Sequence, residues 1–97
     1  MKVEFSDEAK VEIRAAREHY ENERPGLGRE FVLEVRDLVR RIADGPQHFQ
    51  KVARTKARRA VANRFPFKVV FQLMTTHIRV LAVAHQKQRP QYWRRRA

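Results

Sequence analysis

The sequence predicts an α+β domain: a short N-terminal strand, then two antiparallel helices packed on a sheet of three or four antiparallel strands, and a short C-terminal tail or helix. Three observations predict this fold. Residues 65–85 are the most apolar and β-branched part of the chain, and they alternate as two strands of a hairpin. Two segments of helical period precede them. The length of 97 residues suits one domain, residues 1–97, with one sheet layer and one helix layer.

The first strand and the first helix are predicted from the opening 22 residues. Lys2–Phe5 alternates, which predicts a strand with Val3 and Phe5 facing inward. Ser6 is a suitable helix N-cap, and two acids follow it in the first turn, where the helix dipole favours negative charge. A helix is expected over residues 7–22 because apolar side chains recur along one face: Ala9, Ile13, Ala16 and Tyr20.

A second helix is predicted over residues 27–43. Pro25 and Gly26 break the first helix, and Gly45 followed by Pro46 ends the second. The short break predicts an antiparallel pair. The core-facing stripe of the second helix is Leu27, Phe31, Val35, Leu38 and Ile42.

The remaining strands are predicted after residue 47. Residues 47–57 are polar and basic, typical of a loop with a short edge strand near 49–53, and residues 58–64 are weakly strand-like. In the hairpin, Phe67, Val69, Phe71 and Leu73 are predicted to share one face. The second hairpin strand is apolar on both faces, which predicts an interior position: Ile78, Val80, Ala82 and Ala84 on one face, and Leu81 and Val83 on the other.

The C-terminal segment follows His85. Pro90 is compatible with the start of a final helical turn, and Trp93 is expected to anchor this segment on the body. Because both helices are needed on one face of the sheet, the opposite face is expected to stay open unless a partner covers it.

The net charge of +11 is concentrated in one half of the chain. Residues 1–48 hold nine Lys and Arg against eleven acids, whereas residues 49–97 hold thirteen Lys and Arg and no acid. A field of this kind attracts polyanions such as nucleic acid, the ribosome or an acidic protein segment. The alternative interpretation is a basic face that only meets solvent.

Several classes of protein are not indicated. The chain has no cysteine, only three glycines, and no ligand spacing among His19, His48 and His77, so no metal, cofactor or phosphate loop is expected. No apolar run approaches the length of a membrane span, and the N-terminus does not have the pattern of a signal peptide. A soluble cytoplasmic protein is expected.

The order of elements resembles the RelE/ParE toxin superfamily of bacterial type II toxin–antitoxin systems, most of all its ParE branch. The resemblance covers almost the whole chain and depends on three patterns. These are Ser6-Asp7-Glu8-Ala9 after the first strand; Phe65-Pro66-Phe67 opening an alternating strand; and residues 78–85 followed by Arg89-Pro90, Tyr92-Trp93 and Arg96.

The resemblance implies a cytoplasmic growth-inhibiting toxin that a cognate antitoxin holds inactive. ParE-like members inhibit DNA gyrase by protein–protein binding, whereas RelE-like members cut mRNA on the ribosome. For the ParE-like function we expect the basic strands and the C-terminal segment to form the target-binding surface. Its residues would be Arg58, Arg59, Arg64, His85, Arg89, Tyr92, Trp93, Arg94, Arg95 and Arg96.

Two alternative functions stay open. As a RelE-like, metal-independent mRNA endonuclease, the chain would need an acid, a base and cations for the phosphate, and Arg64, His85 and Tyr92 are the candidates. The structural interpretation of the same residues is that His85 hydrogen-bonds the tail and Tyr92 packs beside Trp93. The other alternative is a non-catalytic nucleic-acid-binding module. Arg94, Arg95 and Arg96 would bind anions, or form a solvated tail.

Overall fold

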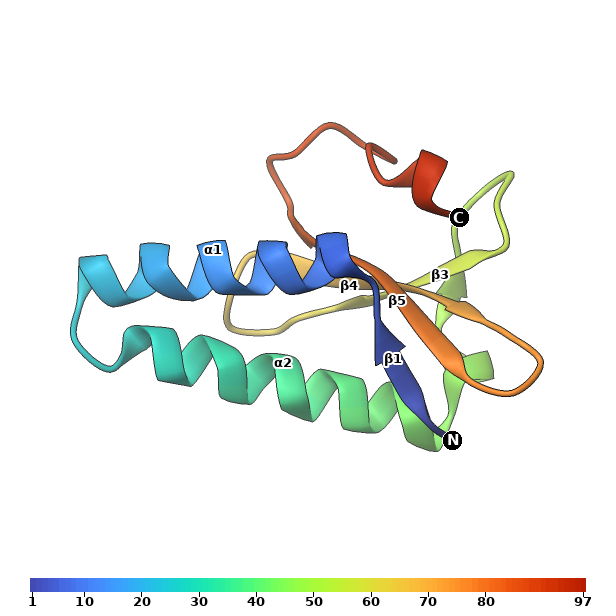
Figure 1. Ribbon diagram of the computed structural model, residues 1–97, viewed down its shortest axis with the longest axis horizontal. Helices are drawn as coiled ribbons and strands as arrows, with labels where there is room; N and C mark the ends of the chain where they lie inside the picture. Colours follow the sequence, from blue (N-terminus) through green and yellow to red (C-terminus); the bar gives the residue numbers. More distant parts are fainter.

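All five strands of the computed structural model belong to one twisted sheet, in the order β1-β5-β4-β3-β2 (Figure 1). The structure describes all residues, 1–97. β5 and β4 form an antiparallel hairpin at the centre, and β1 runs parallel to β5. The elements are β1 (Val3–Phe5), α1 (Asp7–Glu23), α2 (Leu27–Asp44), β2 (Gln50–Lys51), β3 (Ala57–Val61), β4 (Phe67–Leu73) and β5 (Ile78–His85), with short 3-10 turns at Pro46–His48 and Arg94–Arg96.

The predicted α+β architecture is confirmed, and β5 is an interior strand as expected. The sheet is larger than the predicted three or four strands, because β1 joins it as a parallel edge strand. Val3 pairs with Ile78 and Phe5 with Val80. This pairing joins segments about 75 residues apart, so no local sequence pattern could indicate it. No helix is long and apolar enough to cross a membrane.

The helices begin and end where the sequence predicts, within one residue. Ser6 caps α1 by accepting a hydrogen bond from the backbone N–H of Ala9 at 3.1 Å, and Gly45 follows the last residue of α2. Between the helices, Gly26 has a φ of 88°, a conformation that glycine adopts without steric cost. At Gly28 a Cβ would lie 2.7 Å from the carbonyl oxygen of Arg17, so only glycine allows this approach of the two helices.

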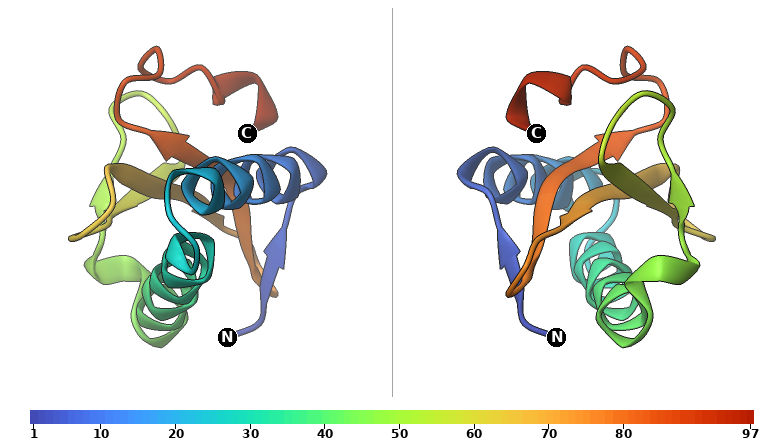
Figure 2. Two further views of the ribbon diagram at one scale, coloured as in Figure 1. Left: turned by 90° about the vertical axis from the view of Figure 1, so that its left-hand side faces the viewer. Right: turned by 90° about the vertical axis from the view of Figure 1, so that its right-hand side faces the viewer.

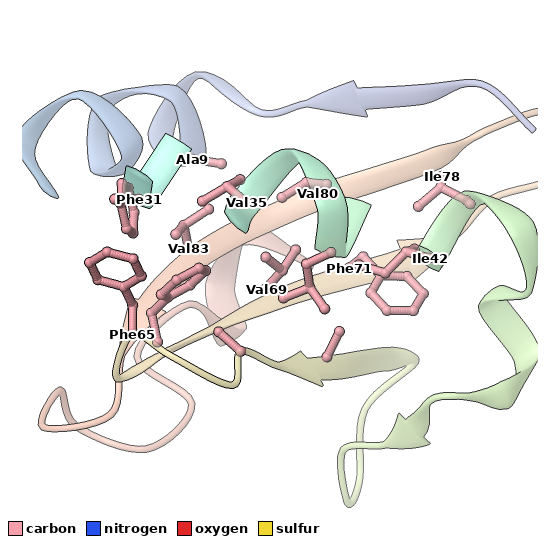
Figure 3. Close-up of a cluster of buried hydrophobic side chains, with 14 residues drawn as sticks. Ala9, Phe31, Val35, Ile42, Phe65, Val69, Phe71, Ile78, Val80 and Val83 are labelled. Atoms are coloured by element: carbon pink, nitrogen blue, oxygen red, sulfur yellow. The ribbon is translucent and has the colours of Figure 1, made fainter. Parts of the chain in front are cut away.

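The main core lies between the helices and one face of the sheet (Figure 3). Phe31 on α2 is at its centre, 1% exposed, with its ring 4.9–5.6 Å from the rings of Tyr20, Phe65 and Phe67. Fourteen buried residues form this cluster: Ala9, Phe31, Val35, Leu38, Ile42, Ala60, Ala62, Phe65, Phe67, Val69, Phe71, Ile78, Val80 and Val83.

A β-bulge in β5 changes which residues share a face. Val70 pairs with Ala82, but the next residue of β4, Phe71, pairs with Val80, so Leu81 is the extra residue. The prediction that Ala82 shares a face with Val80 is therefore wrong, as is the placing of Leu81 with Val83. Both Leu81 and Ala82 lie on the face away from the main core. Strict alternation cannot show a bulge. Leu73 belongs to neither buried cluster and is 42% exposed at the end of β4.

The second face of the sheet is partly covered by the chain itself, which corrects the prediction of an open face. Residues 86–97, here called the tail, fold back over β5 on the side away from α2 (Figure 2). Trp93 anchors the tail, as predicted, and is 1% exposed in a second cluster with Ala57, Val70, Leu81 and Ala82. The helical turn of the tail spans Arg94–Arg96 and does not start at Pro90.

Candidate functional site

The two layers of the molecule differ in charge. α1 and α2 contain ten of the eleven acids and seven of the 22 Lys and Arg residues, which gives the helix layer a net charge of −3. Arg24 lies in the turn between the helices, and the remaining fourteen Lys and Arg residues with one acid, Glu4, give the rest of the chain a net charge of +13. The basic half of the sequence therefore becomes one basic layer, made of the sheet, its loops and the tail.

Eight exposed Lys and Arg residues of this layer make no ion pair, and five of the eight lie close together. These five line two neighbouring hollows that share Arg94. The first hollow lies along the tail and includes Arg89 and Arg95; the second lies between the tail and the loop from β2 to β3, and includes Arg54 and Lys56. None of the five is among the residues in ion pairs. We call Arg54, Lys56, Arg89, Arg94 and Arg95 the cation surface.

The tail is held in place by a carboxylate on α1. Glu12 accepts hydrogen bonds from the hydroxyl of Tyr92 at 2.5 Å, from Nη1 of Arg96 at 3.0 Å and from the backbone N–H of Val83 at 2.9 Å. Arg96 also donates to the carbonyl oxygen of Leu81 at 3.1 Å and lies over the Tyr92 ring. We call Glu12, Tyr92 and Arg96 the tail latch.

The tail latch replaces a missing strand partner. β1 pairs with β5 only as far as Val80, so the outer edge of β5 beyond that residue has no strand beside it. Buried backbone groups need hydrogen-bond partners, and side chains supply them here. The carbonyl of Leu81 accepts from Ser6 Oγ and from Arg96, and the N–H of Val83 donates to Glu12.

The latch also shifts the protonation of its members. Burial first, and then the hydrogen bond and negative charge of Glu12, raise the pKa of the Tyr92 hydroxyl well above its usual 10. Burial alone would lower the pKa of Arg96, but the hydrogen bond and charge of Glu12 outweigh it, and the pKa rises. At neutral pH a protonated phenol and a charged guanidinium therefore hold the tail.

Arg58 and Arg59 on β3 hold the segment before that strand. Arg58 donates from Nη1 to the carbonyl oxygen of Phe49 at 2.8 Å, and Arg59 donates from Nη2 to the side-chain oxygen of Gln50 at 3.0 Å. Both guanidinium groups are half-buried and already have partners.

Arg64 holds the turn between β3 and β4 on α2. Its guanidinium pairs with Glu30, whose carboxyl pKa this hydrogen bond lowers, and lies 5.3 Å from the centre of the Phe65 ring. The side chain of Glu34 accepts hydrogen bonds from the backbone N–H groups of Arg64 and Phe65 at 2.9 and 3.0 Å.

The three nuclease candidates have separate partners. His85 accepts a hydrogen bond at Nδ1 from the backbone N–H of Lys87 at 3.0 Å, Arg64 pairs with Glu30, and Tyr92 donates to Glu12. No hydrogen bond or ion pair joins one candidate to another. A phenol whose pKa is raised this far is also a poor proton donor at neutral pH.

The remaining predicted target residues divide by exposure. Arg89, Arg94 and Arg95 are exposed in the cation surface, whereas Trp93 is buried against the body and Arg96 is half-buried. The indole N–H of Trp93 is buried without a hydrogen-bond partner, although buried tryptophans usually have one, so the ring holds the tail by apolar packing alone.

Sequence reasoning missed Glu12, Arg54 and Lys56. Glu12 lies at the flank of the apolar stripe of α1, between Ala9 and Ala16, which is a position where a carboxylate can reach a covering segment. Arg54 and Lys56 lay within the predicted basic loop but were not singled out. The structure contains no group of three or more His, Cys, Asp or Glu side chains that could hold a metal ion.

The fold and site define a RelE/ParE-like toxin domain: a helical hairpin packed on a central antiparallel sheet, with a basic layer behind it. Residues 3–90 match the family described as the ParE toxin of the type II toxin–antitoxin system, parDE, and the chain belongs to this family. A solved structure described as a chromosomal ParDE toxin–antitoxin system from P. aeruginosa has a similar fold, with a TM-score of 0.80 and 17% identity over 88% of this chain and 95% of that chain. A search of curated protein sequences found no match.

Proposed function

We propose that this chain is a cytoplasmic toxin that inhibits DNA gyrase by binding it, and that a cognate antitoxin keeps it inactive. Membership of the ParE family supports the class. The observation that carries the proposal is the separation of charge: the basic layer has a net charge of +13 and presents unpaired cations, while α1 and α2 together have a net charge of −3. A positive surface of this kind speeds the encounter with a large polyanionic target.

The helix layer offers a different surface, which suits the antitoxin. Arg17, Arg29 and Arg36 line a hollow together with the apolar side chains of Val32 and Leu33, and Leu33 is 47% exposed. An amphipathic acidic segment would place its apolar residues on the valine and leucine and its carboxylates on the three arginines.

The proposal is tested by gyrase supercoiling in the presence of the purified full-length chain, with a translation reaction run in parallel. We expect supercoiling to be inhibited and translation to proceed. The triple variant Arg89→Gln/Arg94→Gln/Arg95→Gln should inhibit supercoiling at least about tenfold less strongly, because it removes the cations of the tail that attract and contact the target. A matched control on the exposed faces of the helices should keep the inhibition: Lys10→Gln, Arg14→Gln and Arg40→Gln.

Codon-dependent cuts in ribosome-bound mRNA, together with unaffected gyrase, would contradict the proposal and favour the nuclease alternative. The variant His85→Ala then tests that alternative directly, since loss of cutting would give His85 a catalytic role. Inertness in both assays, with harmless expression, would contradict the toxin function itself.

A further inference from the structure

We propose that the cation surface binds the sugar–phosphate backbone of duplex DNA directly, without reading its sequence. The toxin would then contact the DNA on which gyrase acts as well as the enzyme. The inference rests on the proposed gyrase function, and it specifies the DNA that gyrase holds as what the tail cations of the same surface contact. It depends on the five residues Arg54, Lys56, Arg89, Arg94 and Arg95.

The first observation is that five cations from two distant segments share one surface. Arg94 lines both hollows, so it joins the tail cations to those of the loop between β2 and β3. In Figure 1 the C-terminus lies beside this loop. A run of cations on one side of a protein is the electrostatic footprint expected of a backbone-binding surface.

The second observation is the chemistry of the lining. Beside the five cations, the two hollows are lined by Pro90, Gln91 and Tyr92, and by Thr55, Gln72 and Ala97. No Asp or Glu is among them, and no large aliphatic side chain. Protein–protein interfaces have an apolar core, whereas protein–DNA interfaces are more polar and more positive. By contrast, the hollow on the helix layer contains the exposed aliphatic side chain of Leu33, so its composition is closer to that of a protein–protein interface.

The third observation is that both segments are ordered by their own hydrogen bonds. In the loop, the Thr55 hydroxyl donates to the carbonyl of Val52 at 2.9 Å and accepts from the N–H of Ala57 at 3.0 Å. In the tail, Trp93 is buried and the latch holds the residues on either side of it. Cations on ordered backbone lose less conformational entropy on binding than cations on a free tail.

DNA binding is measured by fluorescence anisotropy of a labelled 20-base-pair duplex, titrated with the full-length toxin over a range of salt concentrations and without gyrase. Each phosphate contact makes the slope of the logarithm of the binding constant against the logarithm of salt concentration more negative by about 0.9. The double variant Arg94→Gln/Arg95→Gln should therefore reduce the magnitude of the slope by about 2 and weaken binding by about tenfold or more at 0.1 M salt. Arg54→Gln/Lys56→Gln should do the same.

The matched control is Arg14→Gln/Arg40→Gln, which removes two exposed cations from the helix layer. It should leave the slope unchanged, because the proposal requires a particular surface and not net charge alone. Two unrelated duplex sequences should bind with similar affinity. If the control variant loses as much DNA affinity as the surface variants, the proposal is overturned, since the net positive charge of the protein would then explain the binding.

Competition experiments show which kind of polyanion the cation surface prefers. Polyglutamate that displaces the duplex at equal charge concentration would assign the surface to an acidic protein, and single-stranded RNA that binds more tightly would assign it to RNA; either result overturns the DNA proposal. Supercoiling inhibition by a wild-type toxin that does not bind DNA would defeat this inference alone. DNA binding with unaffected gyrase would defeat the proposed function alone.

Discussion

The two faces of the sheet are covered in different ways. On the helix side, fourteen buried residues form one continuous apolar cluster around Phe31. On the tail side there are five, and the only large ring among them, Trp93, depends on a charged latch for its position. The helix side therefore supplies most of the stability of the domain. The tail side positions surface cations, and we expect it to open without unfolding the rest.

The largest effect is expected on the helix side. Phe31→Ala should lower the free energy of unfolding by about 3–5 kcal/mol, because it removes a fully buried ring and leaves a cavity. This is a large fraction of the roughly 5–15 kcal/mol that stabilises a domain. Urea denaturation measures it.

The control for this change is Leu33→Ala on the same helix, whose side chain is 47% exposed. It should change the free energy of unfolding by no more than about 0.5 kcal/mol. A loss at Phe31 as small as that at Leu33 would contradict the assignment of the main core.

The next effect is expected on the tail side, and it should be local. Trp93→Ala should raise hydrogen exchange throughout residues 86–97 by at least about tenfold, while the amides of α2 keep their protection. Trp93 packs in the second cluster with Val70 and Leu81, and α2 contributes no residue to that cluster. Trp93→Phe should restore part of the protection. Equal loss of protection in α2 would show that the two sides unfold as one unit.

A smaller effect is expected at the tail latch. Glu12→Gln keeps the shape of the side chain but removes its charge. It should lower the free energy of unfolding by about 1–3 kcal/mol. The pKa of Tyr92 should fall toward its usual value, because the hydrogen bond and charge of Glu12 contribute to raising it. The ultraviolet absorbance of the phenolate reports this titration.

The matched control is Glu18→Gln, which removes a charge from an exposed position of the same helix. It should leave the Tyr92 titration unchanged. An unshifted titration in Glu12→Gln would mean that burial alone raises the pKa of Tyr92.

The smallest effects concern the dependence of stability on pH. Low pH should weaken contacts of the helical hairpin through Glu21, and high pH should weaken contacts of the tail through Tyr92. Hydrogen bonds from the backbone N–H groups of Gly26 and Gly28 lower the pKa of Glu21 below 4.5, so its stabilisation is present above 4.5 and is lost as the pH falls. The raised pKa of Tyr92 stabilises the fold below pH 10, and this contribution is lost as the pH rises. Acid should therefore loosen the helical hairpin. Alkali should loosen the tail, and to some extent the helix side, where burial raises the pKa of Tyr20.

Thermal melting across pH tests this difference. Glu21→Gln should flatten the acid limb of the Tm profile and leave the alkaline limb unchanged. Tyr92→Phe should do the reverse. A variant that alters both limbs equally would contradict the assignment of each carboxyl or hydroxyl to its own side.

Most of the helix side could be predicted from the sequence, because its signals are local. The stripe from Leu27 to Ile42 has a helical period, and Ser6, Pro25 and Gly45 mark the ends of helices. These predictions are correct to within one residue. The strands β4 and β5 were recognised for the same reason, from alternation and β-branched content.

The tail side was harder to predict, because its features depend on contacts between distant segments. The bulge at Leu81 arises because the pairing register between β4 and β5 shifts by one residue between Val70 and Phe71. Glu12 becomes important only because residues 92 and 96 return to it. A charge total predicts a basic region, but not that Arg64 and Arg96 are paired while Arg94 and Arg95 are free.

The parallel pairing of β1 with β5 has a consequence for biosynthesis. β1 is synthesised long before residues 78–80, with which it pairs, so the sheet cannot close until residue 80 has been made. Contacts so distant in sequence slow folding, because a long loop must close before they form. Until then the apolar faces of both helices have no sheet to cover them. The complete sheet, and the tail that folds over it with Arg89, Arg94 and Arg95, can therefore form only after these residues have been made.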